Sequence, residues 1–551
     1  MNPRTGSPNR THGSRSGYRF GVPHGHRGDG TDLRSVGGVW LWWILVVVGL
    51  CLIALATYDL LQRRHALLRT FPIVGHLRFL LEAIGPELRQ YIVTDNDHEK
   101  PFSRDERRWI YSSAKLQNSL FGFGTDNDLD AAENYLIIKH VAFPLGQPEG
   151  ESAVPDPARP LPSAKVMGGP RGRARAFRPT SIVNISGMSF GSLSGAAIRA
   201  LNMGAARAAT LHTTGEGGIS PHHLHGGDLV WQIGTGYFGC RDEHGRFSLE
   251  RLVARVDETP SVRAIELKLS QGAKPGLGGM LPAAKVTAEV ASIRGIPVGV
   301  DCKSPPFHTA FTDVDGLLEL VETIADATGL PVGIKSAVGE LRFWETLAVR
   351  TEATGRGLDF ITIDGGEGGT GAAPLVFADH VSLPFRWGFS RVYRAFAERG
   401  LADDIVFVGS ARLGLPETGM MAMALGCDLL NVGREAMLAI GCIQSQRCHT
   451  GRCPTGVATQ SAWRQRGLDP TDKSVRCAQY LAALRFELLR LARVCGQPHP
   501  ALVSVDDIEV LEDRFRAVPL GSLFDYGPGW GLPKPADQQE IRRLMDHPTA
   551  G

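Results

Sequence analysis

The sequence predicts an α/β protein built as a (β/α)8 TIM-type barrel, with a single transmembrane helix before it and a helical C-terminal extension after it. From about residue 177, short apolar runs rich in β-branched residues end in Gly or Ser and are followed by Ala- and Leu-rich helical stretches. Eight such units in roughly 250 residues match a (β/α)8 barrel. A doubly wound sheet is the alternative, but it would place one dominant Gly-rich fingerprint after its first strand.

The composition is that of a large globular protein. Of the 551 residues, 43% are hydrophobic, and the formal net charge of +2 gives no reason to expect nucleic-acid binding. The 66 glycines are unusual and cluster in runs such as GEGG, GLGG and DGGEGGTG, which are typical of tight turns or close approach to a ligand. The 9 cysteines lack the density of a disulfide scaffold and suggest a reducing compartment.

The N-terminal part predicts a membrane anchor. Residues 1–38 are rich in Arg, Gly, Ser and His and are expected to be disordered. Residues 39–57 carry no charge and are long enough to span a bilayer; a signal peptide and a buried core helix are the alternatives. Arg63, Arg64 and Arg69 follow the span, so the positive-inside tendency places the bulk of the chain in the cytoplasm.

The remaining boundaries follow from changes in pattern. Residues 58–100 are juxtamembrane, and their amphipathic part is expected to lie against the membrane surface or the body of the protein. The barrel with its additions is assigned to 101–515, including an amphipathic helix at Ser474–Val494. The tail, 516–551, is rich in Pro and Gly, and its pattern predicts no particular element.

Eight apolar runs are predicted to be the barrel strands. Each is short, rich in β-branched residues and followed by turn residues and a helical stretch. The stretch 228–258 is interpreted as a hairpin inserted between two units. The predicted strands are Ile182–Ile185, Thr210–Thr214, Ala264–Leu269, Pro297–Asp301, Pro331–Lys335, Phe360–Asp364, Ile405–Gly409 and Leu429–Gly433.

Three cysteines, Cys442, Cys448 and Cys453, lie in the run GCIQSQRCHTGRCPTGVATQ. Three thiolates in one loop, with Pro454 directly after the third, suit an iron–sulfur cluster. A zinc site normally has a fourth ligand and a CxxC step. His449 could supply that ligand, so zinc stays open, as do buried or redox cysteines without a metal.

The loops after the seventh and eighth predicted strands suggest a phosphate site. They contain Gly409 with Arg412, and Gly433 with Arg434. Backbone N–H groups in glycine turns, with a guanidinium nearby, suit a phosphate dianion, although each glycine could equally serve only a tight turn. A phosphate site directly before an iron–sulfur loop favours flavin mononucleotide, because no GxGxxG fingerprint of a nicotinamide dinucleotide follows a first strand.

Charged residues at strand ends suggest a redox and substrate site. Lys268 and Lys335 could place a cation beside a flavin and tune its potential, unless each points outward to solvent. Glu216, Lys274 and Arg294 could bind a dicarboxylate or an amino acid, with the guanidinium as a fork and the ammonium as a point charge. Each of these three could also be an ordinary surface charge.

A histidine cluster, SPHHLHGG, contains His222, His223 and His225. No carboxylate or cysteine accompanies it at ligand spacing, so the three are expected to be solvent-facing loop residues rather than a metal site. Asp364 is expected to orient the following DGGEGGTG loop rather than to take part in chemistry.

Six motifs occur in the order SGMSFGSLSGAAI, HTTGEGGISP, ELKLSQGAKPGLGGMLPAAKV, DCKSPPFH, DFITIDGGEGGTGAAPL and GCIQSQRCHTGRCPTGVATQ. With them the chain, from about 100 to 480, resembles the FMN-binding domain of glutamate synthases, most closely the stand-alone FMN-binding glutamate synthase family proteins. The resemblance implies a (β/α)8 barrel, FMN and a [3Fe–4S] cluster in a loop at 441–460. It also implies that 2-iminoglutarate, formed from 2-oxoglutarate and ammonia, is reduced by hydride from reduced FMN, with electrons arriving through the cluster.

The resemblance also assigns roles to single residues. It implies that Cys442, Cys448 and Cys453 hold the cluster, and that Glu216, Lys274 and Arg294 bind the 2-oxo acid, with Glu216 and Lys274 catalytic. Together with the strand-end residues above, the expected cofactor-binding residues are Met188, Ser189, Phe190, Gly191, Lys268, Gln271, Lys335, Gly365, Gly366, Gly409, Arg412, Gly433 and Arg434.

The chain departs from the family's pattern at Leu277 and Met280, which replace the Glu and Gln of KPGEGGQLP, and in SPPFHTA, which replaces SPPPHHD. An FMN-dependent oxidoreductase acting on a different amino acid or imine, and a non-catalytic electron-transfer subunit, are therefore alternatives. The sequence shows neither a cysteine nucleophile near Met1 nor a region resembling an FAD/NADPH domain. Ammonia or an amine is expected from solution or a glutaminase subunit, and electrons from a ferredoxin-like donor or a partner redox subunit. This situation resembles that of subunits of N-methylglutamate synthase, where methylamine replaces ammonia.

Overall fold

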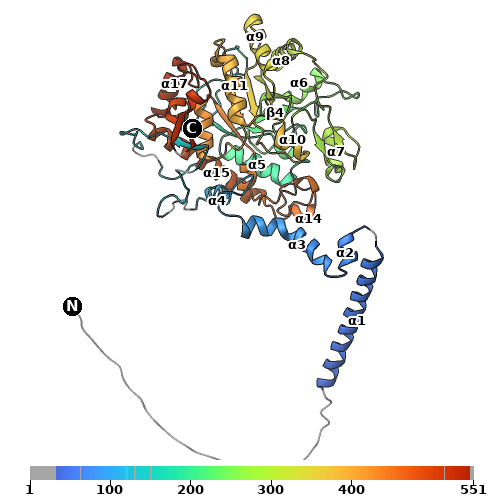
Figure 1. Ribbon diagram of the computed structural model, residues 1–551. Helices are drawn as coiled ribbons and strands as arrows, with labels where there is room; N and C mark the ends of the chain where they lie inside the picture. Colours follow the sequence, from blue (N-terminus) through green and yellow to red (C-terminus); the bar gives the residue numbers. More distant parts are fainter. Residues whose placement is uncertain are drawn as a thin grey trace, which may run out of the picture. The chain divides into compact units, whose positions relative to one another are not determined.

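The computed structural model describes residues 33–546, apart from 63, 118–119, 121, 130–131, 149–151 and 514. Its contacts divide the chain into two compact units, Met1–Thr94 and Asp95–Gly551, which are described separately (Figure 1). Most of the N-terminal segment that was expected to be disordered lies outside the described residues. Its last residues, 33–38, begin a helix instead.

Within the described residues of the first unit lie three helices, α1 (Leu33–Leu61), α2 (Ala66–Thr70) and α3 (Gly75–Leu88), and a π-helical turn, Arg89–Val93. Within α1, Trp40–Leu61 is long and apolar enough to cross a membrane. The Asp59 side chain, which is buried, closes the turn after α1: its carboxylate accepts hydrogen bonds from Ile73 N at 2.9 Å and His76 Nε2 at 3.0 Å. Arg63, one of the three arginines that follow the apolar span in the sequence, lies outside the described residues.

The second unit contains the predicted barrel. Eight parallel strands close on themselves, with β11 paired to β2. The (β/α)8 fold class is therefore confirmed. In chain order the barrel strands are β2 (Val183–Ile185), β3 (His212–Thr213), β4 (Leu229–Ile233), β5 (Val262–Lys268), β8 (Val332–Ser336), β9 (Phe360–Asp364), β10 (Val406–Ser410) and β11 (Leu429–Val432).

One strand prediction was wrong. Pro297–Asp301 is not a strand; Val298 and Val300 are 61% and 53% exposed, and the segment belongs to a long excursion between β5 and β8. The missing strand is Leu229–Ile233, all five residues of which are buried. The stretch 228–258 is therefore no insertion: it contains β4, a short turn bridged at Arg241 and Phe247, and helix α6 (Leu249–Asp257).

The excursion between β5 and β8 carries a small antiparallel pair of its own, β6 (Met280–Leu281) with β7 (Cys302–Lys303). Between these strands, a 3-10 turn at Ala283–Lys285 precedes α7 (Ala288–Arg294), which Thr287 caps by accepting from Val290 N. The GLGG motif of the sequence and Arg294 therefore belong to one long loop that follows β5, at the carboxyl ends of the barrel strands.

Helices cover the outside of the barrel, and polar caps set where several of them begin. Ser194 accepts from Ala197 N at the start of α5, and Asp313 from Gly316 N at the start of α8. The predicted C-terminal helix is longer than expected, and it packs along α5 (Figure 1). The covering helices are α5 (Gly195–Arg207), α6, α8 (Val314–Thr328), α9 (Arg342–Thr354), α11 (Phe385–Ala397), α12 (Pro416–Ala424) and α15 (Pro470–Val494).

The tail, for which the pattern predicted no element, is ordered up to residue 546. Strand β12 (Ile508–Asp513) lies between β1 (Tyr135–Ile138) and β13 (Arg516–Pro519) in an antiparallel sheet. Helices α16 (Leu520–Leu523) and α17 (Pro535–Asp546) follow.

The barrel interior changes character from one end to the other. Because alternate residues of a strand point to the same side, β4 places Val230 and then Gln232 in line, and β9 places Phe360 and then Thr362. The amino-terminal layer is apolar and contains Val230, Ala264, Phe360, Val406 and Leu429. The next layer is polar, so chemistry is directed to the carboxyl ends of the strands.

Candidate active site

A buried polar layer forms the base of the site. Glu266 accepts hydrogen bonds from Gln232 Nε2 and, at 2.6 Å, from Thr362 Oγ1. Lys335 Nζ lies 3.3 Å from Asp364 Oδ2, and both side chains are buried. Burial alone would lower the pKa of Lys335, but Asp364 and Glu266 outweigh it and the pKa is raised. Lys335 therefore points into the barrel and carries a charge.

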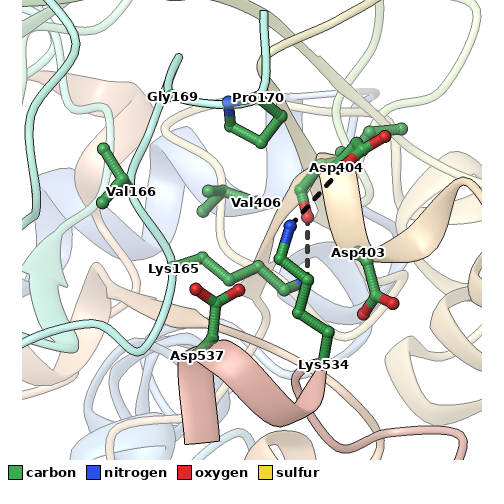
Figure 2. A pocket seen from close by; sticks show the side chains of 10 residues that line it. Lys165, Val166, Gly169, Pro170, Asp403, Asp404, Val406, Lys534 and Asp537 are labelled. Carbon is green, nitrogen blue, oxygen red and sulfur yellow. Dashed lines mark hydrogen bonds and ion pairs between the residues drawn. The ribbon is translucent and has the colours of Figure 1, made fainter. Parts of the chain in front are cut away.

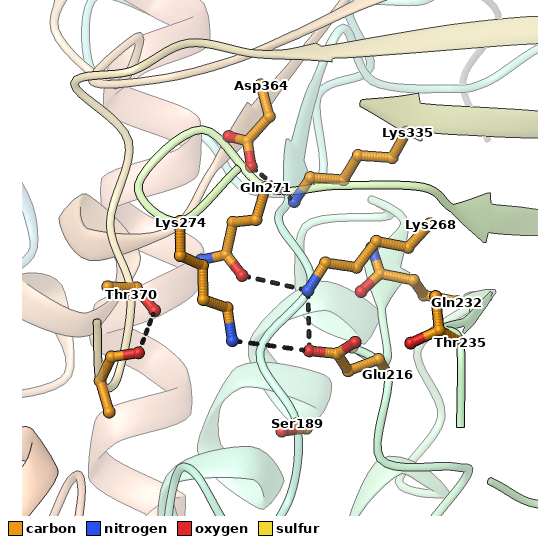
Figure 3. A network of polar contacts seen from close by, with 12 residues as sticks. Ser189, Glu216, Gln232, Thr235, Lys268, Gln271, Lys274, Lys335, Asp364 and Thr370 are labelled. Carbon is orange, nitrogen blue, oxygen red and sulfur yellow. Dashed lines mark hydrogen bonds and ion pairs between the residues drawn. The ribbon is translucent and has the colours of Figure 1, made fainter. Parts of the chain in front are cut away.

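Glu216 is the centre of the next layer (Figure 3). Its Oε1 accepts a hydrogen bond from Lys268 Nζ at 2.8 Å and lies 4.0 Å from Lys274 Nζ. Burial would raise the pKa of Glu216, but Lys268, Lys274 and Arg294 together lower it to about 2. The carboxylate is therefore ionised at every physiological pH.

Lys274 and Arg294 complete a cationic pocket around that carboxylate. Burial lowers the pKa of Lys274, and the attraction of Glu216 offsets this only in part. Arg294 donates through Nη2 to the Phe190 carbonyl at 3.1 Å, and its buried Nε has no hydrogen-bond partner among the described residues. Three cations, Lys268, Lys274 and Arg294, thus surround one carboxylate, and all three side chains are buried.

Glycines make the room for this pocket. A Cβ on Gly234 would lie 2.5 Å from Glu216 Oε2, and one on Gly217 would lie 2.8 Å from Arg294 Nη2. A Cβ on Gly279, in the excursion, would lie 3.0 Å from Glu216 Oε1. The glycine runs of the sequence therefore correspond to backbone that packs directly against charged side chains.

The predicted flavin-facing segment lies beside the same pocket. A Cβ on Gly215, where φ is +74°, would lie 2.4 Å from Ser189 N, so only glycine fits there. Arg294 Nη2 also lies 3.4 Å from Ser189 Oγ. Met188 is half-buried, whereas the Phe190 ring is buried against the His222 ring at 4.6 Å, and Gly191 is in the left-handed region.

Gln271 joins the lysines to the DGGEGGTG loop. It accepts from Lys268 Nζ at 3.0 Å and donates to the Gly369 carbonyl at 2.6 Å. Gly365 and Gly366 do not face an open space: a Cβ on Gly365 would lie 2.6 Å from Phe385 Cβ, and one on Gly366 2.8 Å from the Ser382 carbonyl oxygen. Close packing against these neighbours therefore accounts for glycine at both positions, and no ligand is needed to explain it.

The predicted phosphate loops are only partly free. Gly409 packs tightly, since a Cβ there would lie 2.6 Å from Leu413 Cδ1, whereas Gly433 meets nothing closer than 3.5 Å. Arg412 donates to Glu106 Oε1 at 2.6 Å, and its buried Nε has no partner among the described residues. Arg434 begins helix α13 (Arg434–Ala439) next to Gly433. An unpartnered guanidinium N–H on Arg412 and an open glycine at Gly433, after two neighbouring strands, suit a phosphate.

One segment, Glu99–Tyr111, connects these arginines to the cysteine loop. The Phe102 ring lies 5.2 Å from the guanidinium carbons of both Arg412 and Arg434. The Phe102 backbone exchanges two hydrogen bonds with the Gln444 side chain, at 3.1 and 2.9 Å. Helix α4 (Arg104–Ser113) then delivers Tyr111, which donates to the Cys442 carbonyl at 2.8 Å.

The three loop cysteines are free thiols, and they are close enough to influence one another electrostatically. Burial, with Cys448 and Cys453 as additional causes, raises the pKa of Cys442 to about 12. Among the described His, Cys, Asp and Glu side chains, no three converge closely enough to form a metal site as they stand. The donor set of three adjacent thiols, without a carboxylate, nevertheless has the chemistry of a three-cysteine iron–sulfur site.

A cavity of about 360 Å³ lies at the opposite end of the barrel (Figure 2). It is lined by Val406, at the start of β10, and by the charged residues Lys165, Asp403 and Lys534. The Lys165 ammonium is satisfied: it donates to two backbone carbonyls at 2.9 Å and pairs with Asp428 at 3.1 Å. The cavity lies at the amino-terminal end of the strands. Active sites of (β/α)8 barrels lie at the opposite, carboxyl-terminal end, so we assign this cavity no catalytic role.

Comparison with known proteins decides the family. The family model described as "Conserved region in glutamate synthase" matches residues 173–497, more than half of the chain. The chain belongs to the glutamate synthase family. It is an oxidoreductase of the glutamate synthase type, and the matched region contains every barrel strand, the cationic pocket and the cysteine loop.

Among its curated relatives, the glutamate synthase large subunit-like protein YerD of Bacillus subtilis is 35% identical over 81% of this chain and 90% of its own length. The archaeal glutamate synthase (NADPH) of Methanocaldococcus jannaschii is 34% identical over 61% of this chain, which spans 62% of that relative. A crystal structure of mandelate oxidase overlaps 74% of this chain and 98% of its own chain at 15% identity, with a TM-score of only 0.38.

Some residues of this glutamate synthase-type site were not predicted from the sequence. Gln232 lies on β4, the strand that was not predicted. Glu266 and Thr362 lie inside strands, where the alternation of side chains predicts burial but not a hydrogen-bond partner. His308 donates from Nε2 to the Lys268 carbonyl at 2.9 Å and accepts from the Tyr237 hydroxyl at 3.1 Å. This pair supports the backbone of Lys268, and its two members are far apart in the sequence.

The histidine prediction was partly wrong. His225 is exposed and His222 pairs with Glu289 at 2.9 Å, but His223 is completely buried, with its ring 5.5 Å from that of buried His212. Burial lowers the pKa of both buried histidines, so they are neutral packing residues. The run SPHHLHGG turns inward at its second histidine, a detail that spacing could not predict.

Proposed function

We propose that this chain is an FMN- and iron–sulfur-dependent oxidoreductase that reduces the imine of a 2-oxo acid. The substrates would be 2-oxoglutarate with ammonia or an amine, and the product glutamate or an N-alkyl glutamate. Electrons would come from a ferredoxin-like donor or a partner subunit. Membership of the glutamate synthase family and the names of the relatives support this assignment.

The observation that carries the proposal is the charge of the buried pocket. Lys268, Lys274 and Arg294 surround the single carboxylate of Glu216, so positive charge is in excess around it. Uncompensated buried charge is costly unless a ligand of opposite sign neutralises it. A 2-oxo dicarboxylate carries negative charge that would do so.

The side chains divide the work of binding and protonation. Arg294 would hold one carboxylate as a fork, as its unpartnered Nε allows. Glu216, which stays ionised, would hold the positively charged imine nitrogen by charge and hydrogen bonding. Burial lowers the pKa of Lys274, which makes its ammonium a better proton donor to an imine that is still neutral. When bound, reduced FMN would supply hydride, and the cluster would supply its electrons.

The cofactors would be held by residues of the same face. Ser189, the unpacked Gly433 and the guanidiniums of Arg412 and Arg434 would bind FMN, with Lys335 beside its ring. Cys442, Cys448 and Cys453 would hold a [3Fe–4S] cluster. Of the predicted cofactor-binding residues, Gly365, Gly366 and Gly409 are accounted for by packing alone.

We also propose that α1 spans the membrane and that the catalytic unit faces the cytoplasm. The apolar stretch Trp40–Leu61 supports the first part. Arg64 and Arg69, after the span, support the second. An anchor would hold the enzyme near a membrane-bound electron donor.

A second candidate is an FMN-dependent oxidoreductase of a more apolar imine or amino acid. Leu277 and Met280 flank Gly278 and Gly279, and they are 36% and 49% exposed. Since Gly279 lies against Glu216, these apolar side chains belong to the loop over the pocket. A larger alkyl group on the amine or acid would find contacts there.

Anaerobic flavin spectroscopy tests both candidates. The purified, dithionite-reduced holoprotein should reoxidise on addition of 2-oxoglutarate with ammonia or methylamine, and glutamate or N-methylglutamate should form. Reoxidation only by other imines would select the second candidate. A cofactor-loaded protein that no imine reoxidises would instead be a non-catalytic electron-transfer subunit, and the proposal would be wrong.

A further inference from the structure

Lys285 is a buried cation that the substrate pocket does not use. It lies in the 3-10 turn between β6 and α7, in the same excursion as Arg294, and is 2% exposed. Its ammonium donates to the Ser192 carbonyl at 2.8 Å. Among the described ion pairs, none includes Lys285, so a neutral carbonyl is the only partner the structure gives its charge.

The cysteine loop lies against this lysine. A Cβ on Gly451, which lies between the second and third cysteines, would be 3.8 Å from Lys285 Cγ. The thiols of Cys448 and Cys453 are the groups whose negative charge would attract the ammonium. Arg107 differs from Lys285 in this respect. Its positive charge acts to lower the pKa of Cys442, but a buried ion pair with Glu99 neutralises that charge.

Burying an ammonium without a counter-charge costs several kcal/mol, and proteins avoid it by supplying an anion. A cluster held by three thiolates is anionic, and it would lie where Cys448 and Cys453 are. We propose that Lys285 is the counter-ion of the iron–sulfur cluster and raises its reduction potential, acting as a positioning and tuning residue rather than a catalytic one. This inference rests on the cluster of the proposed function.

The charge has a direct electrochemical consequence. A fixed cation near a cluster stabilises the state with one more electron, so removing it makes reduction harder. Lys285 also binds the carbonyl of Ser192, next to the segment that would face the flavin. Lys285 thereby contacts both the cysteine loop and the residue next to the proposed flavin-facing segment, so it is suited to set the potential difference between the two cofactors.

The test compares full-length holoproteins by spectroelectrochemical titration, with the cluster followed by electron paramagnetic resonance. Lys285→Met removes the charge at similar length, and Lys285→Arg keeps it. Lys303→Met is the matched control, because Lys303 is an exposed lysine of the same excursion, on β7. Iron and sulfide content is measured for each variant.

Lys285→Met should make cluster reduction at least tenfold less favourable, a fall of about 59 mV for a one-electron couple, while Lys285→Arg and Lys303→Met stay near the parent. Loss of the cluster from the Met variant alone would also support the counter-ion role. An unchanged potential in Lys285→Met, or equal cluster loss in the Met and Arg variants, would overturn it. A parent protein without iron and sulfide would instead refute the cluster itself.

Discussion

At the scale of single residues, Glu216 shows how the site stores charge. Its carboxylate is surrounded by three cations, and its pKa of about 2 lies below the ordinary value of 4.5. A depressed carboxyl pKa stabilises the folded state above the unfolded pKa, and this stabilisation is lost as the pH falls through the folded pKa. The contribution is therefore complete above about pH 5 and disappears between 4.5 and 2.

Glu216→Gln should lower the free energy of unfolding by about 3 kcal/mol at pH 7, from the size of the pKa shift. The difference from the parent should shrink as the pH falls from 4.5 toward 2. Urea unfolding followed by tryptophan fluorescence at pH 7 and pH 3 measures it. Equal differences at both pH values would contradict the assignment of charge to Glu216.

Thr362 tests the polar layer below. Thr362→Val keeps the shape of the side chain but leaves Glu266 Oε1 without its 2.6 Å hydrogen bond. A buried acceptor without a partner should cost about 1–3 kcal/mol of unfolding free energy. Thr323→Val is the control, since the Thr323 hydroxyl donates to Glu319 O on an exposed helix turn. Equal effects of the two substitutions would show that the layer contributes little.

At the scale of elements, strand prediction succeeded where burial and turn chemistry agreed. Seven predicted runs are barrel strands, because each is apolar and followed by Gly, Ser or a charged residue at the mouth. Leu229–Ile233 was missed since the YFGC turn after it looked like a hairpin, while the exposed valines of 297–301 imitated a strand. Sequence patterns report apolarity, but not which apolar run the tertiary fold buries.

The same limit applies to the site. The motifs allowed Glu216, Lys274 and Arg294 to be predicted as one substrate site and Lys268 as a neighbour of the flavin. The structure places both lysines beside Glu216. The contacts of Phe102 and Gln444 join segments 342 residues apart, and no local pattern signals such a pairing. Packing of Gly365 and Gly409 against side chains is likewise invisible until the neighbours are known.

Gln444 is the element-scale test of how the cysteine loop is held. Gln444→Met removes the two bonds to the Phe102 backbone and a third, at 3.0 Å, to Glu99. Amide hydrogen exchange across 441–460 should become faster, because the loop loses an anchor. Gln446→Met, which removes only a long 3.5 Å bond on the surface, is the control. Unchanged exchange in both would mean that Tyr111 alone suffices.

At the scale of the whole molecule, the chain separates a unit that contains the apolar helix α1 from a unit that contains the barrel. The contact boundary lies after Thr94, and the second unit contains the barrel, its covering helices and the terminal sheet. Each unit has buried polar contacts of its own: Asp59 with His76 in the first, and Glu266 with Thr362 in the second. The catalytic unit is therefore expected to fold without the N-terminal unit.

Deletion of residues 1–94 should move the protein from the membrane fraction to the soluble fraction and leave its flavin absorbance unchanged. The reason is that Trp40–Leu61 would be removed, while every candidate cofactor-binding residue stays. Fractionation of cells expressing each form measures it. Membrane association that survives the deletion would place the anchor elsewhere.

The sheet of β1, β12 and β13 ties the beginning of the catalytic unit to its end, since Tyr135 pairs with Leu511. A ribosome must therefore synthesise the chain at least as far as Leu511 before β1 finds its partner. Until then the nascent chain carries an unpaired edge, which exposes it to aggregation and to chaperones. Assembly of this sheet is consequently expected to wait until β12 has left the ribosome.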